Sequence, residues 1–141
     1  MKKLSILIAF LFFFSSCSKI DPSGVENFDL FGQWNWVSTN GGFAFHIHSD
    51  PESAGNVIQL FLKEDYGFSL MVNEEIVSTG EYEISMEKSI YSGDLERYIT
   101  FSGNKNFNGI VLNGIIRTHN SNELSISDNY YDGIGSLYQK K

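Results

Sequence analysis

The side chains that could bind a metal ion are few. His46, His48 and Asp50 alternate along a short segment, so an extended chain would place all three on one face. Neutral imidazoles and a carboxylate can hold zinc or another divalent cation, and His119 would supply a fourth ligand. Two histidines on a polar strand edge beside Pro51 are more often simply solvated. We therefore expect no metal and no other cofactor.

Nothing in the sequence resembles a catalytic site. No serine lies in a Gly-x-Ser-x-Gly turn, which is the setting of a hydrolytic nucleophile. Glu81 and Glu83 could serve as the paired acids of a glycosidase, but alternating acids are typical of the solvated face of a half-buried sheet. The sequence therefore predicts a protein that is not an enzyme.

The sole cysteine, Cys17, follows an apolar segment near the N-terminus. A single thiol excludes an internal disulfide and a cysteine-based zinc cluster. Lys2 and Lys3 precede the apolar run Leu4–Phe14, which as a helix would be roughly 17 Å long at about 1.5 Å per residue. A bilayer core of about 30 Å needs a longer helix, so this segment is expected to be a signal peptide.

The residues around the cysteine, Phe14-Ser15-Ser16-Cys17, resemble the lipobox of bacterial lipoproteins, with Phe in place of the usual Leu. The resemblance implies that residues 1–16 are removed and that Cys17 carries acyl chains such as palmitate. Several chains are enough for stable membrane anchoring. Some bacteria sort lipoproteins by the residue that follows the lipidated cysteine, and Ser18 in place of Asp resembles the signal for the outer membrane. We therefore expect a lipid-anchored protein of the bacterial cell envelope. Residues 17–29 are polar and read as a tether.

Composition limits the partners that the rest of the chain can bind. The 141 residues contain 10 Lys and Arg against 17 Asp and Glu, for a formal charge of −7. Loss of Lys2 and Lys3 with the signal peptide would make the remainder still more acidic. An acidic protein of this kind repels a phosphate backbone, so we expect no nucleic-acid partner. The length from residue 30 to 141 suits one domain.

The pattern from Leu30 onward predicts an all-β fold, because short alternating segments recur between Gly, Asn and Asp residues. A small antiparallel up-and-down barrel of eight or nine strands is expected, since closure removes the exposed edges of a long sheet. Residues 87–95 are expected to form a loop. The predicted strands span residues 33–39, 43–48, 56–63, 66–73, 76–86, 97–102, 109–117, 123–127 and 134–139.

Gly32-Gln33-Trp34 resembles the Gly-x-Trp signature of lipocalins. The wider string over residues 30–37 and the Gly41-Gly42 pair are similar to lipocalin-like lipoproteins of Bacteroidota. Shorter likenesses occur at residues 80–82, 132–133 and 138–140. The resemblance implies that Gly32 and Trp34 close one end of the barrel, with the indole beneath a basic residue of the last strand. Lys140 is the candidate for that residue, and Arg117 is its rival.

Two hypotheses for function remain open at this level. Trp36, Phe68, Leu70 and Tyr82 would line an apolar pocket if they share an open inner face, which favours binding of a small apolar ligand. The simpler interpretation is that they form the core. A barrel of short strands can be filled by its own side chains. The alternative is then a protein-interaction or inhibitor module that uses its acidic outer face, with an envelope protein as its partner. A cavity of roughly 300 Å³ or more would favour the ligand.

Overall fold

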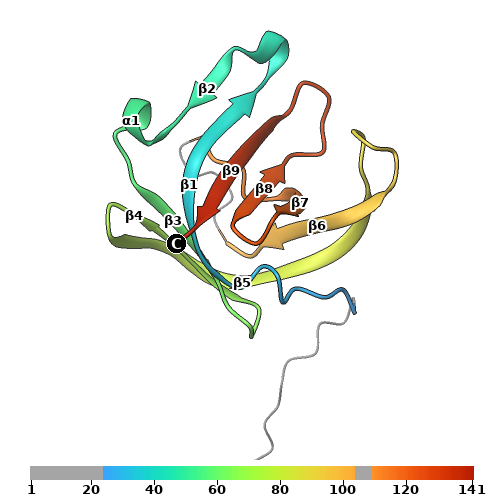
Figure 1. The fold of residues 1–141 in the computed structure, drawn as a ribbon, viewed down its shortest axis with the longest axis horizontal. Helices are drawn as coiled ribbons and strands as arrows, with labels where there is room; N and C mark the ends of the chain where they lie inside the picture. Colours follow the sequence, from blue (N-terminus) through green and yellow to red (C-terminus); the bar gives the residue numbers. More distant parts are fainter. Residues whose placement is uncertain (1–23, 104–108) are drawn as a thin grey trace, which may run out of the picture.

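The computed structural model describes residues 24–103 and 109–141 as a single nine-stranded sheet (Figure 1). The expected signal peptide, Cys17 and the first part of the tether lie outside these described residues. The strands are β1 (Gly32–Gly41), β2 (Ile47–Ser49), β3 (Ile58–Leu62), β4 (Gly67–Val72), β5 (Glu75–Lys88), β6 (Leu95–Phe101), β7 (Gly114–His119), β8 (Glu123–Ser127) and β9 (Ile134–Lys140).

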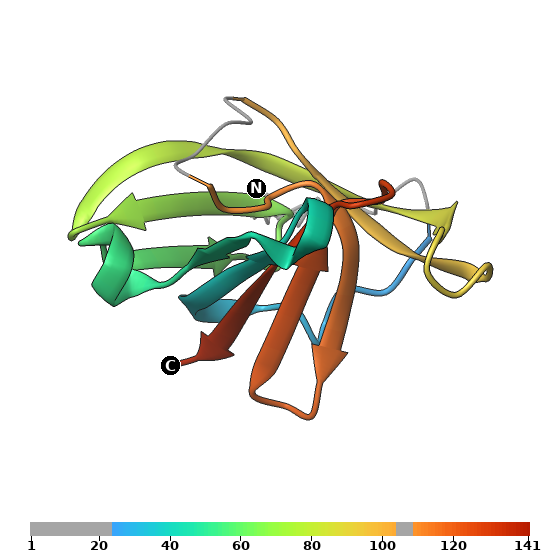
Figure 2. The ribbon, with the colours of Figure 1, turned by 90° about the horizontal axis from the view of Figure 1, so that it is seen from above.

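The sheet closes into a barrel. From β3 to β9 each strand pairs antiparallel with the next, and β1 pairs with both β3 and β9. Eight strands therefore form the wall, while β2 is an extra strand on the end of β1, opposite Thr39–Gly41. In Figure 2 the long strand β5 spans the molecule from its β4 partner to its β6 partner. The predicted antiparallel up-and-down barrel is confirmed.

A β-bulge in β1 changes which side chains face inward. Trp36 pairs with Tyr138, but the next pairing joins Ser38 to Leu137, so Val37 has no partner on β9. The extra residue shifts the alternation by one position. Thr39 is consequently buried, whereas Ser38, which the simple alternation placed on the same face as the tryptophans, is only half-buried.

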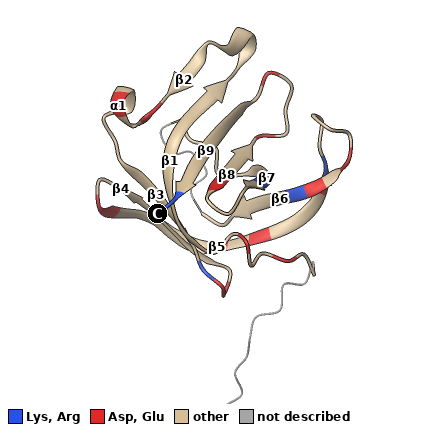
Figure 3. Ribbon diagram, viewed as in Figure 1, with Lys and Arg blue, Asp and Glu red and all other residues tan. Residues whose placement is uncertain are grey.

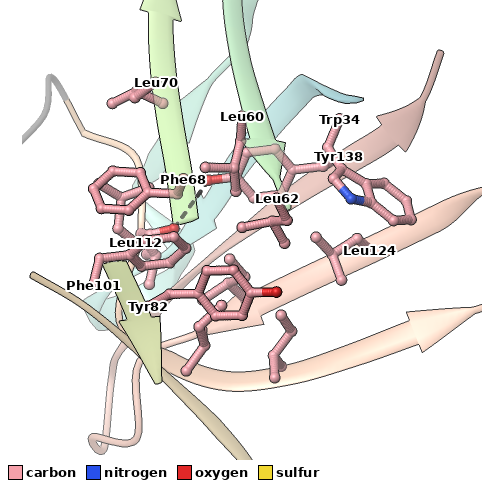
Figure 4. Packing of buried hydrophobic residues seen from close by; sticks show 14 of the residues in the cluster. Trp34, Leu60, Leu62, Phe68, Leu70, Tyr82, Phe101, Leu112, Leu124 and Tyr138 are labelled. Atoms are coloured by element: carbon pink, nitrogen blue, oxygen red, sulfur yellow. Dashed lines mark hydrogen bonds between the residues drawn. The ribbon is translucent and has the colours of Figure 1, made fainter. Parts of the chain in front are cut away.

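The interior of the barrel is filled. Buried side chains from every wall strand form one cluster, shown in part in Figure 4. An irregular segment, residues 110–113, adds Ile110, Val111 and Leu112 to this cluster. The amide N–H of Val111 donates to Ser136 Oγ at 2.8 Å, and its carbonyl oxygen accepts from the Tyr138 hydroxyl at 3.0 Å. Two side chains of β9 thus hold this segment in the core.

Those same hydrogen bonds explain an error in the sequence prediction. Residues 109–117 were expected to form one strand, but β7 begins only at Gly114. In the segment before it, the backbone of Val111 bonds to side chains of β9 instead of to a neighbouring strand. At Gly114 the chain comes so close to β8 that a Cβ would lie 2.0 Å from the carbonyl oxygen of Ser127. Alternation of apolar residues does not distinguish such a crossing from a strand.

The prediction of a strand over residues 43–48 was also wrong in its first half. Phe43–Phe45 form a single 3₁₀ turn, η1, and only residues 47–49 pair with β1. The chain must reverse here so that β2 can pair with the strand it has just left. Gly42 begins the reversal at φ +77°, and Ala44 and Phe45 follow with left-handed φ angles of 54° and 53°.

One short helix, α1 (Pro51–Ala54), follows β2 and was not predicted. Asp50 caps it by accepting from the Ser53 amide at 2.7 Å, and the Ser53 hydroxyl accepts from the Asp50 amide in return. Pro51 occupies the first turn and Gly55 ends the helix in the left-handed conformation. No helix among residues 24–103 and 109–141 has the length and hydrophobicity to cross a membrane.

Candidate functional site

Three loops meet at one end of the barrel, which we call the loop end: residues 42–46, 89–94 and 128–133. The Gly42 amide donates to the carbonyl oxygen of Gly133 at 2.9 Å, joining the first loop to the third. The Tyr91 hydroxyl donates to the carbonyl oxygen of Asp128 at 2.8 Å, and Ile90 N–H donates to Asn129 Oδ1 at 2.9 Å. These hydrogen bonds hold the loops together as one surface.

Beside the loop end, the barrel wall is weakest between β6 and β7. Only two residue pairs join these strands, Tyr98 with Ile115 and Ile99 with Gly114. Beyond them the chain before β7 turns into the core, so β6 lacks a backbone partner there. The Phe101 amide donates instead to the side-chain oxygen of Asn113 at 2.8 Å. This gap in the wall is the seam.

A cavity of about 510 Å³ lies along the seam. We call it the seam cavity. Its walls come from β6, from the segment that enters the core, and from the loop between β8 and β9 together with the first residue of β9. The lining residues are Tyr98, Thr100, Ile110, Val111, Leu112, Asn113, Asp128, Tyr130 and Ile134. Four aliphatic residues, two phenols, a hydroxyl, an amide and a carboxylate line it, so the cavity offers both apolar and polar contacts, with polar atoms forming slightly more of its surface.

Asp128 organises the loop wall of this cavity. Its Oδ2 accepts from the Ile134 amide at 3.1 Å, and its own amide donates to the Ile134 carbonyl at 3.0 Å. Its Oδ1 is shielded from solvent and accepts no hydrogen bond within the described part of the chain. The carboxylate packs so closely on Gly133 that a Cβ there would lie 1.7 Å from Oδ1. Only glycine at 133 permits this arrangement.

The electrostatic environment at the seam is negative. Burial raises the pKa of Tyr98 above its ordinary value, and nearby Glu87, Tyr130 and Asp128 raise it further. Burial and then the charge of Asp128 also raise the pKa of Tyr91, against the opposing effect of Arg117. Both phenols therefore remain protonated donors at neutral pH. In Figure 3 the loop between β8 and β9 carries acidic segments and no basic one.

A second hollow, of about 450 Å³, lies on the outside of β6 and β7. Its two arginines are already engaged by carboxylates. Arg97 donates to both oxygens of Asp29 at 2.6 and 2.7 Å, and Arg117 donates to both oxygens of Glu96. Such two-point contacts leave little of either guanidinium for a ligand. This hollow is therefore the weaker candidate.

The four predicted ligand-lining residues lie together, but in the packed core. Trp36, Phe68, Leu70 and Tyr82 are at most 3% exposed. Phe68 packs edge-on against Phe101 with ring centroids 4.8 Å apart (Figure 4). None of the four lines the seam cavity.

The polar atoms of these core residues also have partners inside the protein. Trp36 Nε1 donates to Thr39 Oγ1 at 3.0 Å. The Tyr82 hydroxyl donates to the carbonyl oxygen of Lys63 at 3.0 Å and accepts from Asn27 Nδ2 at 3.1 Å. The indole is therefore satisfied by a neighbouring side chain, while the phenol ties the core to the backbone at Lys63.

Gly32 and Trp34 lie at the end of the barrel where β9 finishes. Trp34 is fully buried, and its Nε1 donates to the carbonyl oxygen of Leu30 at 2.7 Å. Lys140 Nζ lies 5.0 Å from the centre of the indole ring, within cation–π range. A Cβ at residue 32 would lie 2.9 Å from Lys140 Cε, so glycine leaves room for the lysine. Of the two basic residues considered, Lys140 is the one above the indole, while Arg117 pairs with Glu96.

The histidines are not gathered into a metal site within the described ranges, where no group of three His, Cys, Asp or Glu side chains could hold an ion. His48 Nδ1 bonds to Asn40, and its Nε2 lies 3.5 Å from Asp50. His46 Nδ1 bonds to the carbonyl oxygen of Phe43. His119 bonds to Ser125, on the hairpin between β7 and β8.

The seam cavity itself was not predicted from the sequence. Asp128, Tyr130 and Gly133 lie between the predicted strands 123–127 and 134–139, and residues 110–113 lie within the strand predicted over 109–117. The Asp-x-x-x-x-Gly spacing of the loop was the available signal, but it marks a turn and not a binding site. Comparison with protein-family models, with curated proteins and with solved structures found no match for the chain.

Proposed function

We propose that this protein is a non-catalytic, lipid-anchored, lipocalin-like protein of the bacterial envelope that binds a small, mainly apolar ligand in the seam cavity. The cavity is the observation that carries the proposal: about 510 Å³ lined by both aliphatic and polar groups is enough for a ligand of modest size. The ligand lies at the edge of the barrel, because side chains fill the interior that a larger lipocalin would keep open.

A titration with the neutral, apolar dye N-phenyl-1-naphthylamine tests this proposal. The dye should bind saturably with a rise in fluorescence. Thr100→Trp, which adds an indole to the cavity wall, should weaken binding by at least about tenfold. Ser69→Trp, on β4 away from the cavity, is the matched control and should bind as the unsubstituted protein does. No saturable binding, or equal binding by the Thr100→Trp protein, would contradict the proposal.

Anchoring through Cys17 is the second part of the proposal. It rests on the lipobox-like sequence and on the polar tether that follows it. Residues 24–31 lie on the side of the barrel away from the loop end (Figure 1). An anchor there would leave the seam cavity facing the aqueous compartment. In the native host, the unsubstituted protein should partition into detergent with the outer membrane, and Cys17→Ala should not. Unchanged partitioning of Cys17→Ala would refute the anchor.

A second candidate function is recognition of an envelope protein by the loop end. Four aromatic side chains there are largely exposed: Phe43 at 73%, Phe45 at 86%, Tyr130 at 72% and Tyr131 at 86%. Exposed aromatic residues are common at protein interfaces. Crosslinking in cells should then capture a partner with the unsubstituted protein and lose it with Phe45→Ser. A partner that Phe45→Ser still captures would exclude this surface.

A further inference from the structure

The lining of the seam cavity is electrically one-sided. Among its described lining residues, Asp128 is the only one with a charged side chain, and its charge is negative. The two arginines of the adjoining strands are held by Asp29 and Glu96. They do not offset the charge of Asp128. A ligand that enters the cavity therefore meets a carboxylate that no nearby guanidinium neutralises.

The carboxylate is also incompletely hydrogen-bonded. One backbone amide satisfies Oδ2, but Oδ1 is shielded from solvent without a donor among the described residues. Leaving a charged oxygen in this state destabilises a folded protein unless another group compensates. Because Oδ1 faces Gly133 and is shielded, a ligand in the cavity does not touch it, but a cation bound there would offset the charge of the carboxylate through space.

Two aromatic rings reinforce the same preference. Tyr98 and Tyr130 line the cavity on either side of the seam. The face of a phenol ring attracts a cation, while its hydroxyl oxygen can accept a hydrogen bond from an ammonium group. The negative charges that help to raise the pKa of Tyr98 would also attract a cation bound in the cavity.

We infer that the ligand of the seam cavity is a cationic amphiphile, an alkyl or aryl amine whose ammonium group lies against Asp128 and whose apolar part lies along Ile110 and Ile134. This inference rests on the proposed binding function and adds the charge of the ligand to it. A carboxylate ligand of the same shape is disfavoured, because it would face Asp128 with like charge.

Calorimetric titration with three probes that share one alkyl chain separates charge from apolar contact. At pH 7, 1-octylamine is cationic, 1-octanol is neutral and octanoate is anionic. The amine should bind about tenfold more tightly than the alcohol, and octanoate more weakly than either. Equal affinity of the three probes would overturn the charge preference and leave the binding function intact. Binding of none of them would overturn both.

The Asp128→Asn variant tests whether Asp128 causes the preference for a cationic ligand. The amide oxygen of asparagine can still accept from the Ile134 amide, so the loop keeps that bond while the charge is lost. The advantage of octylamine over octanol should fall below about twofold, with octanol affinity unchanged. Asp132→Asn removes the same charge from the same loop but not from the cavity lining, and it should keep the full advantage. An unchanged advantage in Asp128→Asn, or an equal loss in Asp132→Asn, would refute the assignment.

The probe series on the unsubstituted protein does not depend on any variant folding. A circular-dichroism melt of each variant identifies those that are folded. If Asp128→Asn is unfolded, the order of the three affinities alone decides the inference.

Discussion

Ser136 shows how one hydroxyl can join three parts of the barrel. Its Oγ lies 2.7 Å from Thr39 Oγ1 on β1 and accepts the Val111 amide at 2.8 Å. Thr39 in turn accepts from the indole of Trp36. All of these groups are buried, so each would be costly to leave without a partner. The network connects the first strand, the last strand and the segment that fills the core.

Ser136→Ala should therefore destabilise the protein more than its size suggests. The substitution leaves the Val111 N–H without an acceptor and removes a partner of Thr39. The free energy of unfolding should fall by about 1 to 3 kcal/mol, measured by urea denaturation. Ser69→Ala, on β4 between the buried Phe68 and Leu70, is the matched control and should change stability by less than about 0.5 kcal/mol. Similar losses in the two variants would contradict the network.

At the scale of elements, the loop between β8 and β9 depends on one glycine. A Cβ at residue 133 would approach Asp128 Oδ1 to 1.7 Å and the Tyr130 carbonyl oxygen to 2.8 Å. Because the second contact is with backbone, a rotation of the Asp128 side chain cannot relieve it. The two backbone hydrogen bonds at Gly133, to Gly42 and Tyr130, also fix its position.

Gly133→Ala should lower the free energy of unfolding by about 2 kcal/mol or more and abolish dye binding, because Asp128 must leave the cavity wall. Gly55→Ala is a useful comparison. It has a left-handed φ of +64° but no atom within 4 Å of its Cβ position. Gly55→Ala should lower the free energy of unfolding by about 1 kcal/mol and leave dye binding unchanged. Normal dye binding by Gly133→Ala would show that the loop wall is not part of the site.

The sequence predicted correctly those strands whose position is decided by the local pattern of residues. It missed the features that contacts with distant parts of the chain decide. Strands β3 and β4 alternate cleanly and pair with strands beside them in the chain, so periodicity located them. The bulge at Val37 and the entry of Val111 into the core are both set by β9, which lies about a hundred residues after Val37 and 25 residues after Val111. Alternation within one segment carries no information about either.

Local signals were also present and were not used. Asp50-Pro51 followed by Ser53 and Gly55 is the sequence pattern of a capped helical turn, and it forms α1. The turn at Gly41 and Gly42 lies between the two predicted strands, but it continues through Ala44 and Phe45, where the second strand was expected. No local signal marks the seam cavity, because its walls come from three segments that are separate in the sequence.

For the whole molecule, two carboxylate–arginine pairs link parts of the wall that few backbone bonds join. Asp29 ties the segment before β1 to Arg97 on β6, and it also accepts from Thr118 on β7 at 2.8 Å. Glu96 and Arg117 bridge β6 and β7 at the other end of their two backbone pairs from the seam, with Arg117 Nη2 2.7 Å from Glu96 Oε1. The pKa of Glu96 is lowered from 4.5 to about 2, first by Arg117 and then by Ser92.

Stability should consequently fall in acid. A carboxyl group with a lowered pKa stabilises the fold above its ordinary pKa, and that contribution disappears as the pH falls from 4.5 toward about 2. Arg97 lowers the pKa of Asp29 as well, which adds in the same direction. The free energy of unfolding, measured between pH 7 and pH 2, should decrease through this window.

Glu96→Gln tests the contribution of the Glu96–Arg117 ion pair to stability. The variant should lose about 1 to 2 kcal/mol at pH 7 and show a shallower decline toward pH 2. Glu75→Gln, at an exposed position on β5, removes the same charge without such a pair and should follow the unsubstituted protein. A parallel decline in all three proteins would place the acid sensitivity elsewhere.

The pairing of β1 with β9 has a consequence for how the molecule is made. The first strand shares seven residue pairs with the last and only four with β3. A nascent chain that stops short of residue 134 therefore holds a first strand whose main partner does not yet exist. The complete wall therefore closes only after β9 has been synthesised.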